Sequence, residues 1–421
     1  MKEEIIRINK NTFVHLCNTK KFKSNIIAAF LLTDLNKETV TKTALIPAVL
    51  RRGTTKQKTM KEISMKMDDM YGAFFDASID KIGDKQAVEL YISSIDNDYV
   101  LSDEDLMNES LNFIYDLLYN PKLENGVFDS EYVAQEKETI RELIKGKINN
   151  KSSYATLRCI EEMFGDKPYA LFKYGNEEDL EKIDAKNLYE HYKNLLETSE
   201  KHFYVSGNIN PEKVKEFFYS KFEKADVEEE KIIRTKKDNI TKSEVKNVID
   251  RMNVTQGKLV LGYDVDLELT PENFYKMLVY NAILGSSSNS KLFQNVREKA
   301  SLAYTTRSTY IKHKGVLLVT AGIELDKYDK ALELIKIQIE DMKNGNFSNE
   351  DLKDAKVFLE NLFTSCLDDQ ATMIELEMGQ FIAGIDDDVE KMVERINNVS
   401  REDVIEVANK LSLNTNYYLT K

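Results

Sequence analysis

The second half of the chain repeats the order of elements expected for the first half, and this repeat constrains the fold more than any other feature. Each half contains an apolar helix, a glycine, a second helix, a tyrosine and then two strands. Ala48 in the first helix precedes Tyr71 by 23 positions, and Ala282 precedes Tyr304 by 22. The repeat therefore predicts a duplicated α+β domain.

The spacing of apolar residues gives the individual elements near the N-terminus. Alternating or continuous apolar and β-branched residues predict strands, and a 3.6-residue apolar period predicts helices. The predicted strands are Ile5–Ile8, Thr12–Cys17, Asn25–Leu32, Phe74–Ile79, Ala87–Ile95 and His202–Ser206, and the predicted helices are Thr39–Leu50, Met60–Met70, Asp103–Leu118, Ser130–Ile148, Leu180–Leu196 and Pro211–Phe222. Strands and helices alternate, as a sheet backed by helices requires.

A charged segment separates the two halves. Residues 224–247 are almost entirely polar or charged, whereas the flanking sequence has regular apolar periods. A segment of this kind is typical of a linker between domains. We therefore predict an N-terminal domain over 1–223, a linker over 224–247 and a C-terminal domain over 248–421.

Charge and composition exclude several classes of protein. The net charge of −13 is opposite to the basic footprint of nucleic-acid-binding proteins. The longest apolar stretch, 25–32, is far shorter than the ~20 residues that span a bilayer. The N-terminus lacks the pattern of a signal peptide, and Cys17, Cys159 and Cys366 are too few and too far apart for a disulfide framework. We expect a cytoplasmic protein that binds neither nucleic acid nor membranes.

The segment from Leu284 to Tyr304 carries a specific resemblance. It contains Leu-Gly-Ser, Leu-Phe, Val-Arg-Glu-Lys and Leu-Ala-Tyr in that order. This run resembles the C-domain signature of the metallopeptidase family that includes pitrilysin, insulin-degrading enzyme and mitochondrial processing peptidase. The resemblance extends over the whole chain, because the two halves match the family's N- and C-domains in order. It implies an α+β fold with two homologous domains, each a mostly antiparallel sheet of about six strands backed by helices, arranged as a clamshell.

Active members of that family bind zinc through the inverted motif His-x-x-Glu-His and a later glutamate. Three protein ligands leave one position for a water, and zinc lowers the pKa of that water to about 7. In active members an apolar stretch that ends at Gly-Thr follows this motif. Gly53-Thr54 supplies that ending in this chain and fixes the register of the motif. The histidine positions then fall on Ala44 and Ala48 and the general-base position on Pro47. The later glutamate helix of the family matches 136–143, and its registration on Ile140 places the third-ligand position on Leu143.

No other residues restore the motif. The four histidines have no pair at the required spacing; they are His15, His191, His202 and His313. Glu142, next to Leu143, lies on a different face of its predicted helix, and the glutamates of that helix have the spacing of a solvated face. The resemblance thus implies no catalytic residue and no metal in this chain, with zinc expected only in a partner subunit.

Two side chains of the C-domain signature remain. Arg297 and Tyr304 have the spacing of the family's Arg and Tyr pair, which hydrogen-bonds the substrate backbone. The alternative is that Arg297 pairs with Glu298 and that Tyr304 is a core residue. The strand Gly72–Asp80 corresponds to the family's edge strand, along which an extended peptide adds as a further strand.

Three functions fit this pattern. The favoured one is a non-catalytic subunit that binds an extended peptide substrate and pairs with a similar-sized chain bearing His-x-x-Glu-His, or with a second copy of itself. The chain resembles the motif-less member of bacterial heterodimeric pairs associated with elongation factor P modification or bacteriocin-like peptide maturation. The second is a catalytically dead scaffold or peptide-binding protein. The third, least favoured, is a stand-alone peptidase with unrecognised metal ligands.

Overall fold

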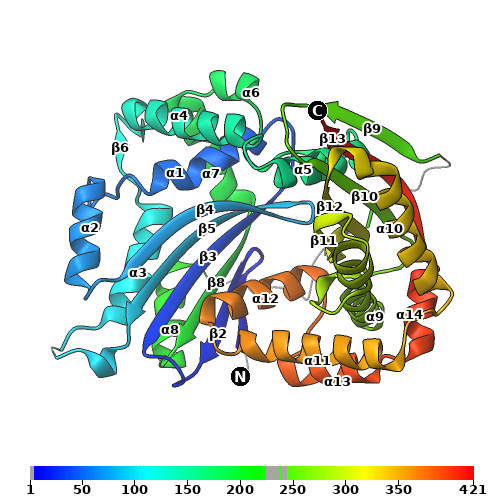
Figure 1. The fold of residues 1–421 in the computed structure, drawn as a ribbon. Helices are drawn as coiled ribbons and strands as arrows, with labels where there is room; N and C mark the ends of the chain where they lie inside the picture. Colours follow the sequence, from blue (N-terminus) through cyan, green and yellow to red (C-terminus); the bar gives the residue numbers. More distant parts are fainter. Residues whose placement is uncertain (1–3, 102, 224–236, 239, 241–243) are drawn as a thin grey trace. The chain divides into compact units, whose positions relative to one another are not determined.

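The computed structural model describes residues 4–101, 103–223, 237–238, 240 and 244–421 (Figure 1). These residues form two compact units. The first contains the described residues within 1–145 and 171–233, and the second contains those within 146–170 and 234–421.

The first unit has a six-stranded sheet in the order β1-β2-β8-β3-β5-β4. All neighbours are antiparallel except β2 and β8, which are parallel. The strands are β1 Glu4–Asn9, β2 Thr12–Asn18, β3 Ser24–Asp34, β4 Phe74–Ile82, β5 Lys85–Ile95 and β8 Glu200–Gly207, with a separate pair β6 Leu123–Glu124 and β7 Val127–Phe128. Figure 1 shows β4 at one edge of the sheet.

Helices of the first unit pack on one face of this sheet. They are α1 Val40–Leu50, α2 Met60–Asp69, α3 Leu106–Tyr119, α4 Ser130–Gly146, α6 Glu177–Glu181, α7 Ala185–Thr198 and α8 Pro211–Lys221, with the short 3₁₀ turn η1 Asn97–Tyr99. Alternate strand residues such as Leu31 and Leu90 face Leu45 and Leu117 of the helices in one core. Burial of such side chains stabilises the unit by about 1.5–3 kcal/mol each.

The second unit has a five-stranded sheet in the order β11-β12-β10-β13-β9. Its strands are β9 Lys246–Arg251, β10 Gly257–Val265, β11 Ala303–Ile311, β12 Val316–Ile323 and β13 Leu411–Thr420. β9 is parallel to β13, and the other neighbours are antiparallel. Strand order and direction therefore match β4-β5-β3-β8-β2, which confirms the duplicated α+β domain. The second sheet has five strands, not the expected six, because β1 has no counterpart among the described residues.

The two tyrosines of the sequence repeat are not equivalent in the structure. Tyr71 lies in the turn before β4, whereas Tyr304 is the second residue of β11. The non-glycine residue with a positive φ in that turn is Tyr71 in the first unit (φ 59°) and Ser301 in the second (φ 51°). The second turn thus places its tyrosine inside the strand.

Helices of the second unit surround its sheet. They are α5 Lys151–Phe164, α9 Pro271–Asn281, α10 Tyr328–Lys343, α11 Asn349–Cys366, α12 Gln370–Ala383, α13 Val389–Asn398 and α14 Arg401–Ala408, with π-helical turns η3 Ala282–Ser286 and η4 Leu292–Lys299 and 3₁₀ turns η2 Pro168–Ala170, η5 Lys312–Lys314 and η6 Leu325–Lys327. No helix in the described part of the chain has the length and apolar content needed to cross a bilayer.

α5 differs most from the sequence-based expectation. It was not predicted, and it packs on the sheet of the second unit although it lies within 1–223. Its apolar residues Ala155, Cys159 and Met163 form a core cluster with Val260 and Tyr417. The chain therefore passes from the first unit into the second, back into the first, and again into the second.

The predicted linker 224–247 lies only partly within the structure. Residues 224–236, 239 and 241–243 of the linker lie outside the described residues. Its last two residues, Lys246 and Asn247, belong to β9.

Candidate functional site

The helix that corresponds to the zinc helix is α1. Ala44 and Pro47 are buried in it, and Ala48 is half-buried. Ala44 belongs to the apolar core of the first unit. Methyl groups and a proline ring have no lone pair to donate to a metal. These three positions therefore do not fit a zinc ion.

The helix that corresponds to the third-ligand helix is α4. Leu143 is exposed on it and offers no donor atom. The nearby glutamates bind arginines: Glu136 forms an ion pair with Arg52, and Glu138 forms one with Arg141. Across the described residues, no group of three or more His, Cys, Asp or Glu side chains is placed to hold a metal ion. The side chains present thus do not fit the zinc site of active relatives.

One histidine contacts α1, but it has a structural partner. His191 of α7 lies 2.8 Å from Thr43, measured from Nε2 to Oγ1. Burial, and secondarily the charge of Lys42, lowers the pKa of His191 to about 4. Burial and two neighbouring lysines also lower the pKa of His313 to about 3. Both rings are therefore neutral near pH 7.

The lowered pKa values of these two histidines predict that the fold loses stability in acid. Each folded-state pKa lies below the ordinary value of 6.5, so folding favours the neutral ring. Their stabilising effect is complete above pH 6.5 and is lost as pH falls through 4 and then 3. The variant His191→Gln retains a hydrogen-bonding group but does not titrate in this range. Between pH 7 and 4.5, the free energy of unfolding in urea is expected to fall by about 2 kcal/mol less for this variant than for the native chain. Parallel stability curves for the two proteins would contradict this assignment.

Arg297 and Tyr304 both lie in the second unit with exposed side chains. Arg297 is in η4, 44% exposed, with its guanidinium 4.7 Å from the ring centre of Phe293. Its Nε lies 3.4 Å from Glu298 Oε1. Tyr304 is 53% exposed, and its hydroxyl donates to Glu324 Oε1 at 3.4 Å. Tyr304 is thus not a core residue, and the predicted pairing of Arg297 with Glu298 is present.

The sequence reasoning missed two neighbours of this pair. Phe293 precedes Arg297 by four positions, a spacing that brings side chains together on a helix and was available as a signal. Glu324 follows the end of β12, and no local pattern links it to Tyr304. Whether Arg297 and Tyr304 contact a substrate stays a prediction.

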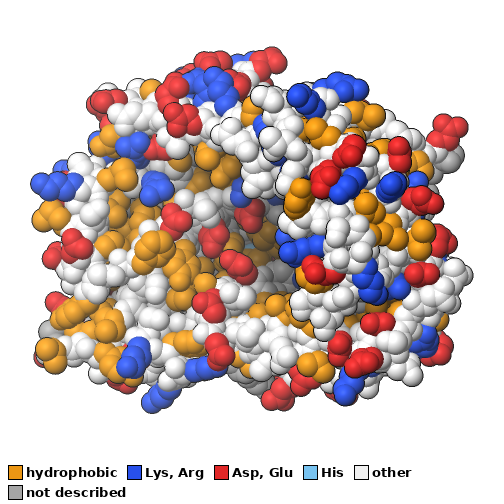
Figure 2. All heavy atoms as spheres, in the orientation of Figure 1, with side chains coloured by type: hydrophobic (Ala, Val, Ile, Leu, Met, Phe, Trp, Pro, Cys, Tyr) orange, Lys and Arg blue, Asp and Glu red, His pale blue; other side chains and the backbone are white. Residues whose placement is uncertain are grey.

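The edge strand is where the sequence placed it, over Phe74–Ile82 in place of Gly72–Asp80. β4 pairs only with β5 among the described strands. Phe74 is 59% exposed and meets the ring of Tyr91 edge to face. Figure 2 shows hydrophobic side chains gathered on the first unit in the region of β4 and β5. A strand edge without a second partner among the described strands, next to the exposed ring of Phe74, suits an extended peptide.

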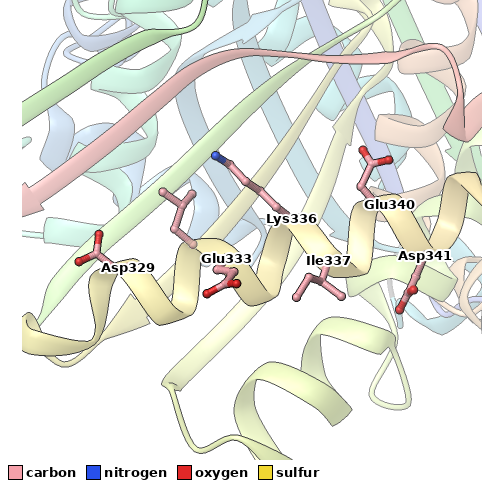
Figure 3. Close-up of a pocket in the computed structure, with 7 residues that line it drawn as sticks. Asp329, Glu333, Lys336, Ile337, Glu340 and Asp341 are labelled. Carbon is pink, nitrogen blue, oxygen red and sulfur yellow. The ribbon is translucent and has the colours of Figure 1, made fainter.

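A shallow cavity of about 400 Å³ lies along α10. Its side chains all come from that one helix and are mostly acidic, and Figure 3 shows them spread along it. Glu340 pairs with Lys343, and Asp341 with Lys291. Because these groups do not converge on one point, we do not assign a site to this helix.

Comparisons with known proteins agree with this geometry. Residues 182–358 match the family described as "Peptidase M16 inactive domain". The chain is 34% identical to "Probable inactive metalloprotease YmfF" of Bacillus subtilis, over 96% of this chain and 95% of the relative. It is 23% identical to "Uncharacterized zinc protease YmxG" of the same species, over 73% of this chain and 74% of the relative.

A solved structure shares the fold along almost the whole length. It is a conserved protein from Enterococcus faecalis V583, with a TM-score of 0.90, 24% identity and coverage of 99% of this chain and 98% of that one. The 34% identical relative from Bacillus subtilis, which is named a probable inactive metalloprotease, matches 96% of the chain. The chain belongs to the peptidase M16 family and is an inactive, metalloprotease-like member of it.

Proposed function

We propose that the chain is a non-catalytic subunit of a zinc peptidase. It binds an extended peptide and pairs with a similar-sized chain bearing His-x-x-Glu-His, which supplies zinc and cuts the peptide. The observation that carries the proposal is the exposure of Arg297 and Tyr304 in a chain whose zinc positions hold Ala44, Pro47 and Ala48. Donor groups suited to a peptide carbonyl are kept where the chemistry is lost.

The edge of β4 supports the peptide-binding part. An unpaired edge offers alternating N–H and C=O groups to an added strand, so affinity comes from the backbone and depends little on sequence. Phe74 and Tyr91 provide apolar surface on one face of that strand. Pairing along β4 requires no metal.

Peptide processing by this chain requires a partner subunit. A chain without zinc ligands contributes to peptide cleavage only when another subunit brings the metal. Bacillus subtilis has one relative named inactive and another named a zinc protease, as such a pair requires. Cys17, Cys159 and Cys366 are too few and too far apart in the sequence for a disulfide framework, which fits a reducing, cytoplasmic location.

The test begins with capture of the tagged chain from its own host. Stoichiometric recovery of a chain with His-x-x-Glu-His is expected, and the purified pair is then assayed for peptide cleavage. Arg297→Ala and Tyr304→Phe are expected to lower kcat/KM of the pair about tenfold or more, because each removes a donor to the substrate. Arg251→Ala and Tyr99→Phe make the same two changes at other exposed positions and serve as controls.

A scaffold without peptide processing is the second candidate. It is favoured by the partners that Arg297 and Tyr304 already have within the chain, Glu298 and Glu324. In that case Arg297→Ala and Tyr304→Phe are expected to behave as the control variants do. Recovery of the bait alone, with no cleavage activity, would exclude the subunit function and leave the scaffold.

A further inference from the structure

The second unit has a surface cavity of about 670 Å³ beside the N-terminus of α5 and the turn between β9 and β10. Nine residues line it, including two lysines and no aspartate or glutamate. Carboxylates outnumber basic side chains in this chain, 72 to 59. A cavity with only positive charges in its lining therefore departs from the charge of the rest of the chain.

Among the described residues, both lysines have neutral hydrogen-bond partners. Lys151 Nζ donates to the carbonyl of Ile148 at 2.8 Å, and Lys258 Nζ donates to the side-chain carbonyl of Gln256 at 3.1 Å. In the part of the chain covered by the structure, the contacts of both ammonium groups are with these neutral oxygens and not with carboxylates. Burial also lowers the pKa of Lys258. An anion in the cavity would attract both ammonium groups and would offset the desolvation of Lys258.

Neutral donors complete the lining. Ser152, Thr255 and Asn149 are among the lining residues, and their side chains carry hydroxyl and amide donor groups. The first turn of α5 contains no acidic side chain, so the partial positive charge of this helix end is not neutralised locally. Lysines with hydroxyl and amide donors are a set that binds phosphate oxygens.

We propose that this cavity, the α5 cavity, binds the phosphate group of a small molecule. Its volume lies in the range of small-ligand sites, about 300–1,000 Å³. Lys151 supplies one charge from the start of α5, and Lys258 supplies the other from β10. The site uses neither Arg297 nor Tyr304, so it stands independently of the peptide-binding function.

The experiment is a titration of the full-length chain with inorganic phosphate at constant ionic strength, followed by calorimetry. Saturable binding is expected. Lys151→Met and Lys258→Met are each expected to weaken it about tenfold, the effect of one lost charge-assisted contact. Lys186→Met, at an exposed lysine of α7, is the matched control and is expected to bind as the native chain does.

Two results would overturn the proposal. One is a heat that rises without saturation and equally in all variants, which marks a general salt effect. The other is equal binding of acetate, which marks a site for carboxylates in place of phosphates. If Lys258→Met lowers the melting temperature, Lys151→Met alone decides, because Lys151 lies at the helix end and bonds only to the Ile148 carbonyl.

Discussion

A fragment of residues 244–421, produced alone, is expected to be insoluble or unfolded, although it contains all five strands of the second sheet. The fragment lacks α5 and η2, whose buried apolar side chains cover one face of that sheet. Those side chains are Ala155, Cys159, Ile160, Met163, Phe164 and Tyr169. Without them, Val260, Leu318 and Tyr417 are exposed to water. Each lost contact of this kind costs about 1.5–3 kcal/mol, against a total stability of about 5–15 kcal/mol for a typical domain.

Polar contacts of α5 and η2 add to the effect. Arg158 pairs with Asp250 of β9 at 3.0 Å. Lys314 is fully buried, and its ammonium lies within 6 Å of the ring centres of Phe164 and Tyr169. Removing those rings takes away two cation–π contacts of the buried Lys314 ammonium group, and this loss destabilises the fold further.

Co-production with residues 4–223 is expected to restore a soluble complex of the two fragments, because that fragment carries α5. The measurement is co-purification followed by circular dichroism and urea unfolding. Met163→Asp in the first fragment is expected to abolish recovery, since its side chain is buried against β10. Ser153→Asp, at an exposed position of α5, is the control. A cooperatively folded 244–421 fragment would refute the assignment of α5 to the second core.

This behaviour of α5 shows what sequence patterns reveal and what they do not. The strands and helices of the first 100 residues were predicted within a few positions, because their apolar periods are strong and local. α5 also has a helical period in Ala155, Cys159, Ile160 and Met163, so the helix itself is encoded locally. Even with α5 identified, its docking on a distant strand was not predictable, because an apolar face does not specify which sheet it covers.

The candidate site also has parts that the sequence reveals and parts that it does not. Loss of the zinc ligands at Ala44, Pro47 and Ala48 was inferred from a resemblance over a short motif, and the structure places all three on one helix. The neighbours of Tyr304 and the α5 cavity depend on contacts between segments far apart in sequence. Lys151 and Lys258 are 107 positions apart, and no linear pattern connects them.

Gly285 shows why one residue of the C-domain motif is glycine. A Cβ atom at this position would lie 2.6 Å from the backbone nitrogen of Ser308 and 2.7 Å from Leu292 Cδ1. The Ser308 backbone belongs to β11 and cannot move without shifting the strand. Close approach of η3 to β11 therefore requires the absence of a side chain.

Gly285→Ala is accordingly expected to lower the free energy of unfolding by about 3 kcal/mol, because overpacking against backbone is at the upper end of such costs. Urea unfolding of the full-length chain measures the change. Gly146→Ala is the matched control, since the nearest atom to its Cβ would be 3.6 Å away. The strand that shifts is the one bearing Tyr304, so the variant is also expected to weaken peptide cleavage by the proposed pair. Native stability in Gly285→Ala would show that η3 and β11 do not approach this closely in solution.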